Sequence, residues 1–160
     1  HIIQALGKIP KEKRPKYSLV GYGEQYPYLK KLAEKLEVDI NFIGNGKDGV
    51  KFKEIQKSLF MIQISSGIPI LEAASMNRMS ISYKDPHMME VFKDIPTWVE
   101  RNNINALTKE IELHLNDTML CYRKGQLAYN KMLSLCDEVK FVEQVEYQLQ
   151  KAITNYGNKK

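Results

Sequence analysis

The residues best placed to do chemistry lie between Leu59 and Asn77. Leu59–Ile64 is a short apolar run typical of a buried parallel strand, and Ser65-Ser66-Gly67 interrupts it. Pro69 then fits the first turn of a helix, where its missing N–H would lack a partner in any case. A strand, a glycine turn and a helix start present free amides and the positive end of a helix dipole at one point. This arrangement predicts an anion site, commonly one for phosphate.

Glu72 falls at the end of that first helical turn. A carboxylate in this place can accept hydrogen bonds from sugar hydroxyls. The same residues also fit a plain strand-to-helix corner, in which the serines and the proline only shape the backbone. The motif by itself therefore predicts an anion site without naming its ligand.

The sequence around this motif predicts strands that alternate with helices, and these elements would hold the motif in place. Strands are expected at Tyr17–Val20, Asp39–Ile43, Leu59–Ile64 and Met79–Tyr83, with a short edge strand at Trp98-Val99. Helices are expected at His1–Ile9, Tyr26–Leu36, Lys51–Lys57, from Pro69 onward, for one turn at Met88–Phe92, at Asn105–Leu115 and over Thr118–Tyr156 in two pieces divided near Cys136-Asp137. Strands that alternate with helices, without hairpin turns, predict an α/β fold with a parallel sheet covered on both faces.

Ligands of such sheets bind beyond the carboxyl ends of the strands. This rule places four loops on one rim of the predicted domain, at residues 21–24, 44–49, 65–72 and 84–87. Gly21 and Gly23 allow close backbone approach, but the third glycine of a dinucleotide fingerprint is missing, so no NAD site is predicted. Together the four loops predict a ligand cleft whose ligand stays open.

The composition narrows the class of protein. The chain has 160 residues, enough for one domain with a hydrophobic core, and 43% of them are hydrophobic. The net charge of +5 suits a phosphorylated ligand or an anionic membrane surface. No aromatic and basic recognition motif points to nucleic acid, and no apolar run is long enough for a membrane span.

The cysteines and histidines show no metal-ligand spacing, so no metal site is expected. Cys121 and Cys136 fall in a helical region. We expect two buried thiols, with a disulfide between them as the alternative. The first residues, from His1, look like the middle of a helix, which predicts a chain that starts inside a larger protein.

The order of these segments resembles the C-terminal, donor-binding domain of retaining glycosyltransferases with two Rossmann-like domains, the GT-B architecture of group 1 or family 4. The matching motifs are Val20-Gly21-Tyr22-Gly23-Glu24, Phe42-Ile43-Gly44, Ser66-Gly67-Ile68-Pro69-Ile70-Leu71-Glu72-Ala73, the strand from Met79, and Asn103-Ile104-Asn105-Ala106-Leu107 before a helix. The resemblance covers nearly the whole chain, and its most specific part runs from Gly67 to Ala73. It implies one Rossmann-like α/β/α domain over residues 1–160, the C-terminal half of a GT-B fold. The N-terminal acceptor domain and the first strand would precede His1.

The resemblance implies ligand-binding roles around the central motif. Glu72 matches the glutamate that binds the ribose hydroxyls of the nucleotide. Gly67 and Ile68 match the turn whose backbone amides approach the diphosphate and the donor sugar, and Ser66 precedes them in the same loop. The bound molecule would be a nucleotide-diphosphate sugar, which is a substrate and not a cofactor.

Two further loops complete the implied site. Gly44 and Asn45 match the strand end that reads the base, and Gly21 and Gly23 match a turn close to the nucleotide. No catalytic residue is assigned within this chain. Transfer in this architecture needs no bound metal, because positive groups and helix dipoles stabilise the leaving diphosphate.

One position departs from the family pattern. Ile64 stands eight positions before Glu72, where the family has a glutamate that contacts the donor sugar. Three hypotheses therefore remain: the donor domain of a transferase that acts on a glycan, lipid or protein acceptor, a non-catalytic subunit with a degenerate donor site, and half of a sugar-nucleotide epimerase. The first implies a retaining hexosyltransferase of polysaccharide biosynthesis. It would be cytoplasmic, peripheral to the inner face of a membrane, and inactive as the isolated chain.

Overall fold

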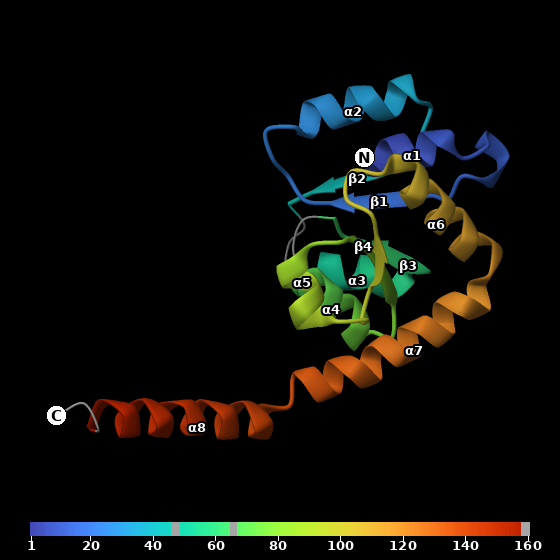
Figure 1. Cartoon of the computed structure of the whole chain (residues 1–160). Helices are drawn as coiled ribbons and strands as arrows, with labels where there is room; N and C mark the ends of the chain where they lie inside the picture. Colours follow the sequence, from blue (N-terminus) through green and yellow to red (C-terminus); the bar gives the residue numbers. More distant parts are fainter. Residues whose placement is uncertain (46–48, 65–66, 158–160) are drawn as a thin grey trace.

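Helices and strands alternate along the chain in a computed structural model that describes residues 1–45, 49–64 and 67–157 (Figure 1). The strands are β1 (Tyr17–Val20), β2 (Ile40–Gly44), β3 (Phe60–Ile62), β4 (Met79–Tyr83) and β5 (Thr97–Val99). The helices are α1 (Ile2–Lys8), α2 (Tyr26–Lys35), α3 (Val50–Lys57), α4 (Ile68–Ser75), α5 (Pro86–Phe92), α6 (Ile104–Asn116), α7 (Thr118–Leu135) and α8 (Glu138–Gly157), and a 3-10 turn, η1 (Lys11–Lys13), follows α1. The alternation expected from the sequence is confirmed.

The paired strands are parallel, and they form two sheets. In the first sheet β1 pairs with β2, with Tyr17 opposite Ile40. In the second sheet β4 lies between β3 and β5, with Phe60 opposite Met79 on one side and Ile81 opposite Thr97 on the other. The predicted parallel α/β fold is confirmed, and the structure adds that the sheet is divided between β1 and β3.

The core is built around β4, whose five residues are all buried. Met79 and Ile81 belong to a hydrophobic cluster that includes buried residues of α1 and α6. Because side chains alternate along a strand, Ser80 and Ser82 face the opposite side, where α4 and α7 contact β4. The second sheet is therefore the middle of three layers, with helices on both faces.

The C-terminal helices begin and end within one residue of the positions that the sequence predicts. The Asp117 side chain accepts a hydrogen bond from the Leu120 amide at 2.8 Å and caps α7, and the helical tail divides between Leu135 and Glu138. Both cysteines are free thiols; Cys121 is buried but Cys136 is exposed. The expectation of two buried thiols was wrong for Cys136, because this residue ends α7 beyond the packed part of the helix.

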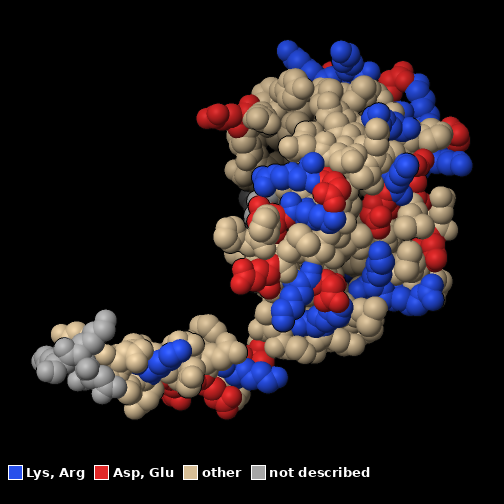
Figure 2. Space-filling model, viewed as in Figure 1, with Lys and Arg blue, Asp and Glu red and all other residues tan. Residues whose placement is uncertain are grey.

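The last helix, α8, leaves the body of the domain (Figures 1 and 2). Its exposed apolar side chains include Val139, Phe141, Val142, Val145, Leu149 and Ile153. Within the described residues, no helix is long and apolar enough to cross a membrane. On the face in Figure 2, the basic and acidic side chains are interspersed and do not form a single basic patch.

Close packing of α7 against the turn before β4 depends on Gly125. A Cβ atom at this position would lie 2.1 Å from the backbone oxygen of Asn77 and 3.3 Å from the Met79 amide nitrogen. We predict that Gly125→Ala destabilises the chain by about 2 kcal/mol, since overpacking against backbone outweighs the gain of about 1 kcal/mol in helix propensity. Unfolding in urea measures this change.

Gly23 offers the matched control, because a Cβ there would meet no heavy atom within 4 Å. Gly23→Ala should change the free energy of unfolding by less than about 0.5 kcal/mol. Equal stabilities of the two variants would contradict the packing argument.

His114 of α6 is completely buried in a polar network. Its Nδ1 lies 2.8 Å from the Glu110 carbonyl oxygen, and its Nε2 lies 3.0 Å from the Lys124 Nζ, which also donates to Thr97. Nδ1 therefore donates and Nε2 accepts, as in a neutral imidazole. Burial lowers the pKa of His114 and outweighs the hydrogen bond to the Glu110 carbonyl and the carboxylates of Glu110 and Asp117, which raise it; the charge of Lys124 adds to the lowering.

This network predicts a loss of stability in acid. The unfolded chain takes up a proton at His114 near pH 6.5, whereas the folded chain takes it up only at lower pH. The contribution of neutral His114 to the free energy of unfolding is thus fully present above about pH 6.5 and is lost as the pH falls below that value. We predict that the free energy of unfolding in urea falls less between pH 7.5 and pH 5.5 for His114→Gln than for His87→Gln. His87 is exposed, so His87→Gln is the control.

Candidate ligand site

The loops that follow β1 and β2 meet at two of the predicted glycines. The Gly21 amide donates to the Gly44 carbonyl oxygen at 2.8 Å. Gly21 has φ +144° and Gly44 has φ +69°, values that L residues with side chains rarely adopt. The structure therefore brings these two predicted residues together at the carboxyl end of the first sheet.

The neighbouring predicted residues leave this corner open. Asn45 is exposed, and the space beside the Gly23 Cα is free of neighbouring heavy atoms to a distance of 4 Å from the point that a Cβ would occupy. A Cβ at Gly21 would likewise meet no heavy atom of the described chain within 4 Å. Among the described residues, the backbone at Gly21 and Gly23 is thus open to the approach of a bound molecule.

The start of α4 forms the second part of the site. Gly67 is the half-buried N-cap, and Ile68 begins the helix with 71% of its surface exposed. No side chain among the described residues caps α4. Pro69 has no amide proton and the Ile70 amide donates to the Gly67 carbonyl oxygen at 2.9 Å, so the Ile68 amide is the one in this turn that an anion could meet. Ser66, the other residue predicted here, lies outside the described residues.

Glu72 is the fifth residue of α4, one position beyond the first turn in which the sequence placed it, because the helix begins at Ile68, and a lysine holds its side chain. Its Oε1 accepts from the Lys51 Nζ at 2.5 Å, and 17% of the Glu72 side chain is exposed. The buried Oε2 has no hydrogen-bond partner among the described residues. One carboxylate oxygen is thus oriented by an ion pair, while the other keeps its capacity to accept.

Sequence reasoning missed Lys51. It lies in the first turn of α3, after the loop that follows β2, and it reaches Glu72 on a different helix. No local spacing signals such a pair, because 21 residues separate the two side chains. The order of α3 and α4 around β3 brings them together.

The position of the family's first glutamate is apolar in this chain. Ile64 is half-buried and packs against the main hydrophobic cluster. It lines a small pocket with Tyr83, Asp85 and Arg101, among other residues. Asp85 is already engaged there, since it accepts from the Met88 amide at 3.3 Å and pairs with Arg101 at 3.2 Å.

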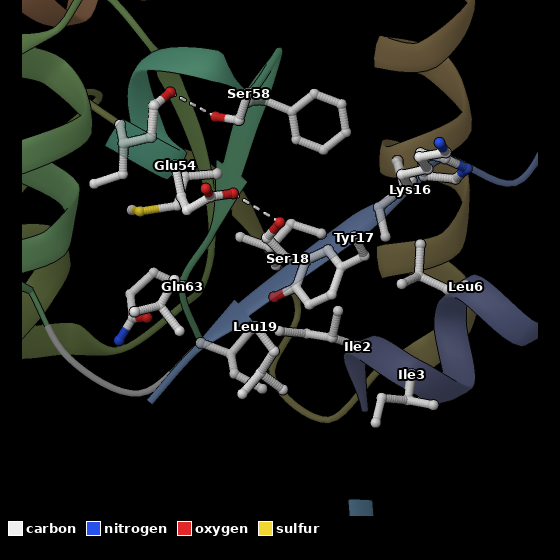
Figure 3. A pocket seen from close by; sticks show the side chains of 18 of the residues that line it. Ile2, Ile3, Leu6, Lys16, Tyr17, Ser18, Leu19, Glu54, Ser58 and Gln63 are labelled. Carbon is white, nitrogen blue, oxygen red and sulfur yellow. Dashed lines mark hydrogen bonds between the residues drawn. The ribbon is translucent and has the colours of Figure 1, made fainter. Parts of the chain in front are cut away.

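A cavity of about 770 Å³ opens between the two sheets (Figure 3). Val20 of β1 lines it next to Gly21, and Pro69 of α4 lines it next to Ile68. Ser18 of β1 donates to the Glu54 carboxylate of α3 at 2.9 Å and bridges the two halves of the domain. Burial raises the pKa of Tyr17 in β1 to about 12, so its phenol stays neutral at physiological pH.

The parallel sheets with covering helices define a Rossmann-like domain of the GT-B class, and solved structures share this fold. HepE of Anabaena in complex with UDP-glucose matches with a TM-score of 0.78 at 20% identity, over 93% of this chain and 44% of that chain. The catalytic domain of cholesterol-α-glucosyltransferase from Helicobacter pylori matches with a TM-score of 0.74 at 21% identity, over 83% of this chain and 87% of that chain. TarM, an S. aureus protein, matches with a TM-score of 0.75 at 18% identity, over 93% of this chain and 31% of that chain.

Residues 1–131 match the family described as Glycosyl transferases group 1, and the chain belongs to this family. This is the family that the motifs of the sequence resemble. The chain spans less than half the length of HepE and TarM. A comparison with curated proteins found no match to the sequence.

Seven of the eight predicted site residues thus fall into two groups, and the eighth lies outside the described residues. Gly21, Gly23, Gly44 and Asn45 lie at the ends of β1 and β2; Gly67, Ile68 and Glu72 lie at the start of α4; Ser66 is outside the described residues. Their contact with a nucleotide sugar stays a prediction. The two groups flank the rim of the cavity between the sheets, which Val20 and Pro69 line.

Gly67 is the residue of this site with the tightest packing. A Cβ at Gly67 would lie 2.2 Å from Cε2 of Phe92 and 2.8 Å from Cε of Met88. We predict that Gly67→Ala displaces the Phe92 ring and destabilises the domain by about 1–3 kcal/mol. Urea unfolding measures this cost.

A double-mutant cycle with Phe92→Leu tests the stated cause. Phe92→Leu removes the clashing ring atoms, so the cost of Gly67→Ala should fall by at least about 1 kcal/mol in that background. Additive costs would show that Phe92 is not the source of the strain.

Proposed function

We propose that this chain binds the nucleotide-sugar donor of a glycosyltransferase that transfers a sugar to a glycan, lipid or protein acceptor. The observation that carries the proposal is Glu72, which Lys51 orients beside the uncapped start of α4. A diphosphate would meet the Ile68 amide at the helix start, and the ribose hydroxyls would donate to the carboxylate. Gly21 and Gly23 would leave space for the base beside the end of β2.

Relatives of the same fold support a nucleotide sugar as the ligand. HepE was solved with UDP-glucose, and further structures of it contain UDP with glucose and UDP alone. We propose a hexose donor and transfer with retention at the anomeric carbon. The leaving diphosphate would be stabilised without a bound metal, by the Ile68 amide at the start of α4 and by positive groups such as Lys51.

The acceptor and the remaining catalytic groups would come from another domain of the protein, so that the 160-residue chain alone would be inactive. The exposed apolar residues of α8 support contact with such a domain or with a membrane surface. We place the protein in the cytoplasm, peripheral to the inner face of the membrane, with a role in polysaccharide biosynthesis.

A non-catalytic subunit is the second candidate, and Ile64 is the observation that favours it. An isoleucine packed against the hydrophobic core cannot accept a hydrogen bond from a donor sugar. Such a subunit would bind a nucleotide without transferring its sugar. The third hypothesis, half of an epimerase, is disfavoured by the family to which the chain belongs.

Calorimetric titration with UDP, GDP and ADP tests donor binding on the longest natural polypeptide that contains this chain. We expect one nucleotide to bind selectively and Glu72→Gln to weaken its binding by about 10- to 100-fold, the effect of losing hydrogen bonds to a charged acceptor. Absence of binding to all three nucleotides would contradict the proposal. For a bound UDP, 2′-deoxy-UDP should lose affinity with the wild type but not with Glu72→Gln.

Glu37→Gln is the matched control, because Glu37 also pairs with a lysine, Lys11, but far from α4 in the fold. This variant should bind nucleotide like the wild type. Binding that survives Glu72→Gln, together with no turnover of any donor by the full-length protein, would favour the non-catalytic subunit.

A further inference from the structure

Three aromatic rings follow one another at the corner where the loops after β1 and β2 meet. The ring centroids of Phe42 in β2 and Tyr26 in α2 lie 5.3 Å apart, and those of Tyr26 and Tyr22 lie 5.1 Å apart. These distances are typical of stabilising aromatic pairs. Phe42 and Tyr26 are half-buried, whereas Tyr22 is 69% exposed. The three residues, which we call the aromatic row, thus lead from the sheet outward to Tyr22.

The backbone that carries Tyr22 is held at both ends. The Gly21 amide donates to the Gly44 carbonyl oxygen at 2.8 Å, and the Tyr26 amide donates to the Gly23 carbonyl oxygen at 2.9 Å. Tyr22 lies between these two anchored glycines, and its ring rests against that of Tyr26. The ring is therefore presented from a short turn of fixed geometry.

A positive charge lies over the inner part of the aromatic row. The Lys30 Nζ is 5.1 Å from the centroid of the Tyr26 ring and 5.8 Å from that of the Phe42 ring, within the range of cation–π contacts. Lys30 thus covers the two inner rings. Tyr22, at the outer end, is the most exposed ring of the three.

The space beside Tyr22 is open to a flat ligand. A Cβ at Gly21 or at Gly23 would meet no heavy atom of the described chain within 4 Å, so a planar ring can approach the backbone on either side of Tyr22. Asn45 is exposed directly after β2, and its side-chain amide can both donate to and accept from the edge of such a ring. The corner thus combines a surface for the face of a planar ring with a polar group for its edge.

The packing of the domain does not account for Tyr22. This residue belongs to neither of the hydrophobic clusters that the described residues form, so its ring contributes little to the core. Tyr28 of α2 offers a comparison, because 61% of its surface is exposed. Two residues separate it from Tyr26 along the helix, which turns it to a different side from the aromatic row.

We propose that Tyr22 stacks on the base of the bound nucleotide. The inference rests on the proposed function, because it concerns the same donor. With the diphosphate at the start of α4 and the ribose at Glu72, the base extends toward the ends of β1 and β2, where Tyr22 lies. Stacking tolerates every base, since each base has a π-face. Tyr22 therefore strengthens the binding of any nucleotide, and groups at the edge of the base, such as Asn45, select among them.

Calorimetric titration tests the contribution of the ring, in the longest natural polypeptide that contains this chain and with each of UDP, GDP and ADP. We expect Tyr22→Ala to weaken the binding of nucleotide by about 5- to 150-fold, the effect of losing one aromatic ring that stacks on a base. Tyr22→Phe keeps the ring and should bind nearly as tightly as the wild type. Tyr28→Ala is the matched control and should bind like the wild type, because Tyr28 lies outside the aromatic row.

Two further measurements separate stacking from an effect on the fold. Urea unfolding should give Tyr22→Ala the stability of the wild type, because Tyr22 lies outside both hydrophobic clusters. A base that stacks on an indole quenches its fluorescence, so nucleotide should quench the emission of Tyr22→Trp but not that of Tyr28→Trp. Trp98 is the one natural tryptophan of the chain and adds the same background to both variants.

Three outcomes would overturn this inference alone. Nucleotide binding that is as tight in Tyr22→Ala as in Tyr28→Ala would show that the ring does not contact the ligand. Equal quenching in the two tryptophan variants would place the base elsewhere. Equal losses of affinity in Tyr22→Phe and Tyr22→Ala would assign the effect to the hydroxyl group and not to stacking. Absence of binding to all three nucleotides would overturn the proposed function as well, so the two failures are distinguishable.

Discussion

The central strand of a parallel sheet has hydrogen bonds along both edges and cover on both faces, and this constraint explains most of the core. β4 satisfies it, with β3 and β5 at its edges, α1 and α6 over one face and α4 and α7 over the other. All five of its residues are buried as a result. β1 and β3 each pair with a strand on one edge, and the cavity between the two sheets lies along their other edges.

The same geometry creates the candidate site. Parallel strands end at a common rim, so their loops gather there whatever their order in the sequence. Gly21 and Gly44 are joined by a hydrogen bond at one side of this rim, and α4 begins at the other. Lys51 reaches across from α3 to orient Glu72, which makes the carboxylate part of a fixed arrangement and not a freely moving surface group.

The departures from the family pattern are as informative as the matches. Ile64 packs into the hydrophobic cluster at the position where the family pattern has a glutamate, and the neighbouring Asp85 is held by Arg101 and the Met88 amide. The chain therefore combines a Rossmann-like fold of the GT-B class with an apolar residue at the position of the family's first glutamate. Both a transferase and a nucleotide-binding subunit are consistent with this combination, and turnover of a donor distinguishes them.

The sequence by itself determined the elements and the principal motif, because these depend on local patterns. Apolar runs predicted the strands, Asp117 predicted the start of α7, and Gly67 to Ala73 predicted both the strand-to-helix corner and the family. Tertiary structure decided the Lys51–Glu72 pair, the exposure of Cys136 and the division of the sheet between β1 and β3. Each of these depends on residues that the fold brings together or holds apart across long stretches of chain, and spacing along the sequence carries no record of such distances.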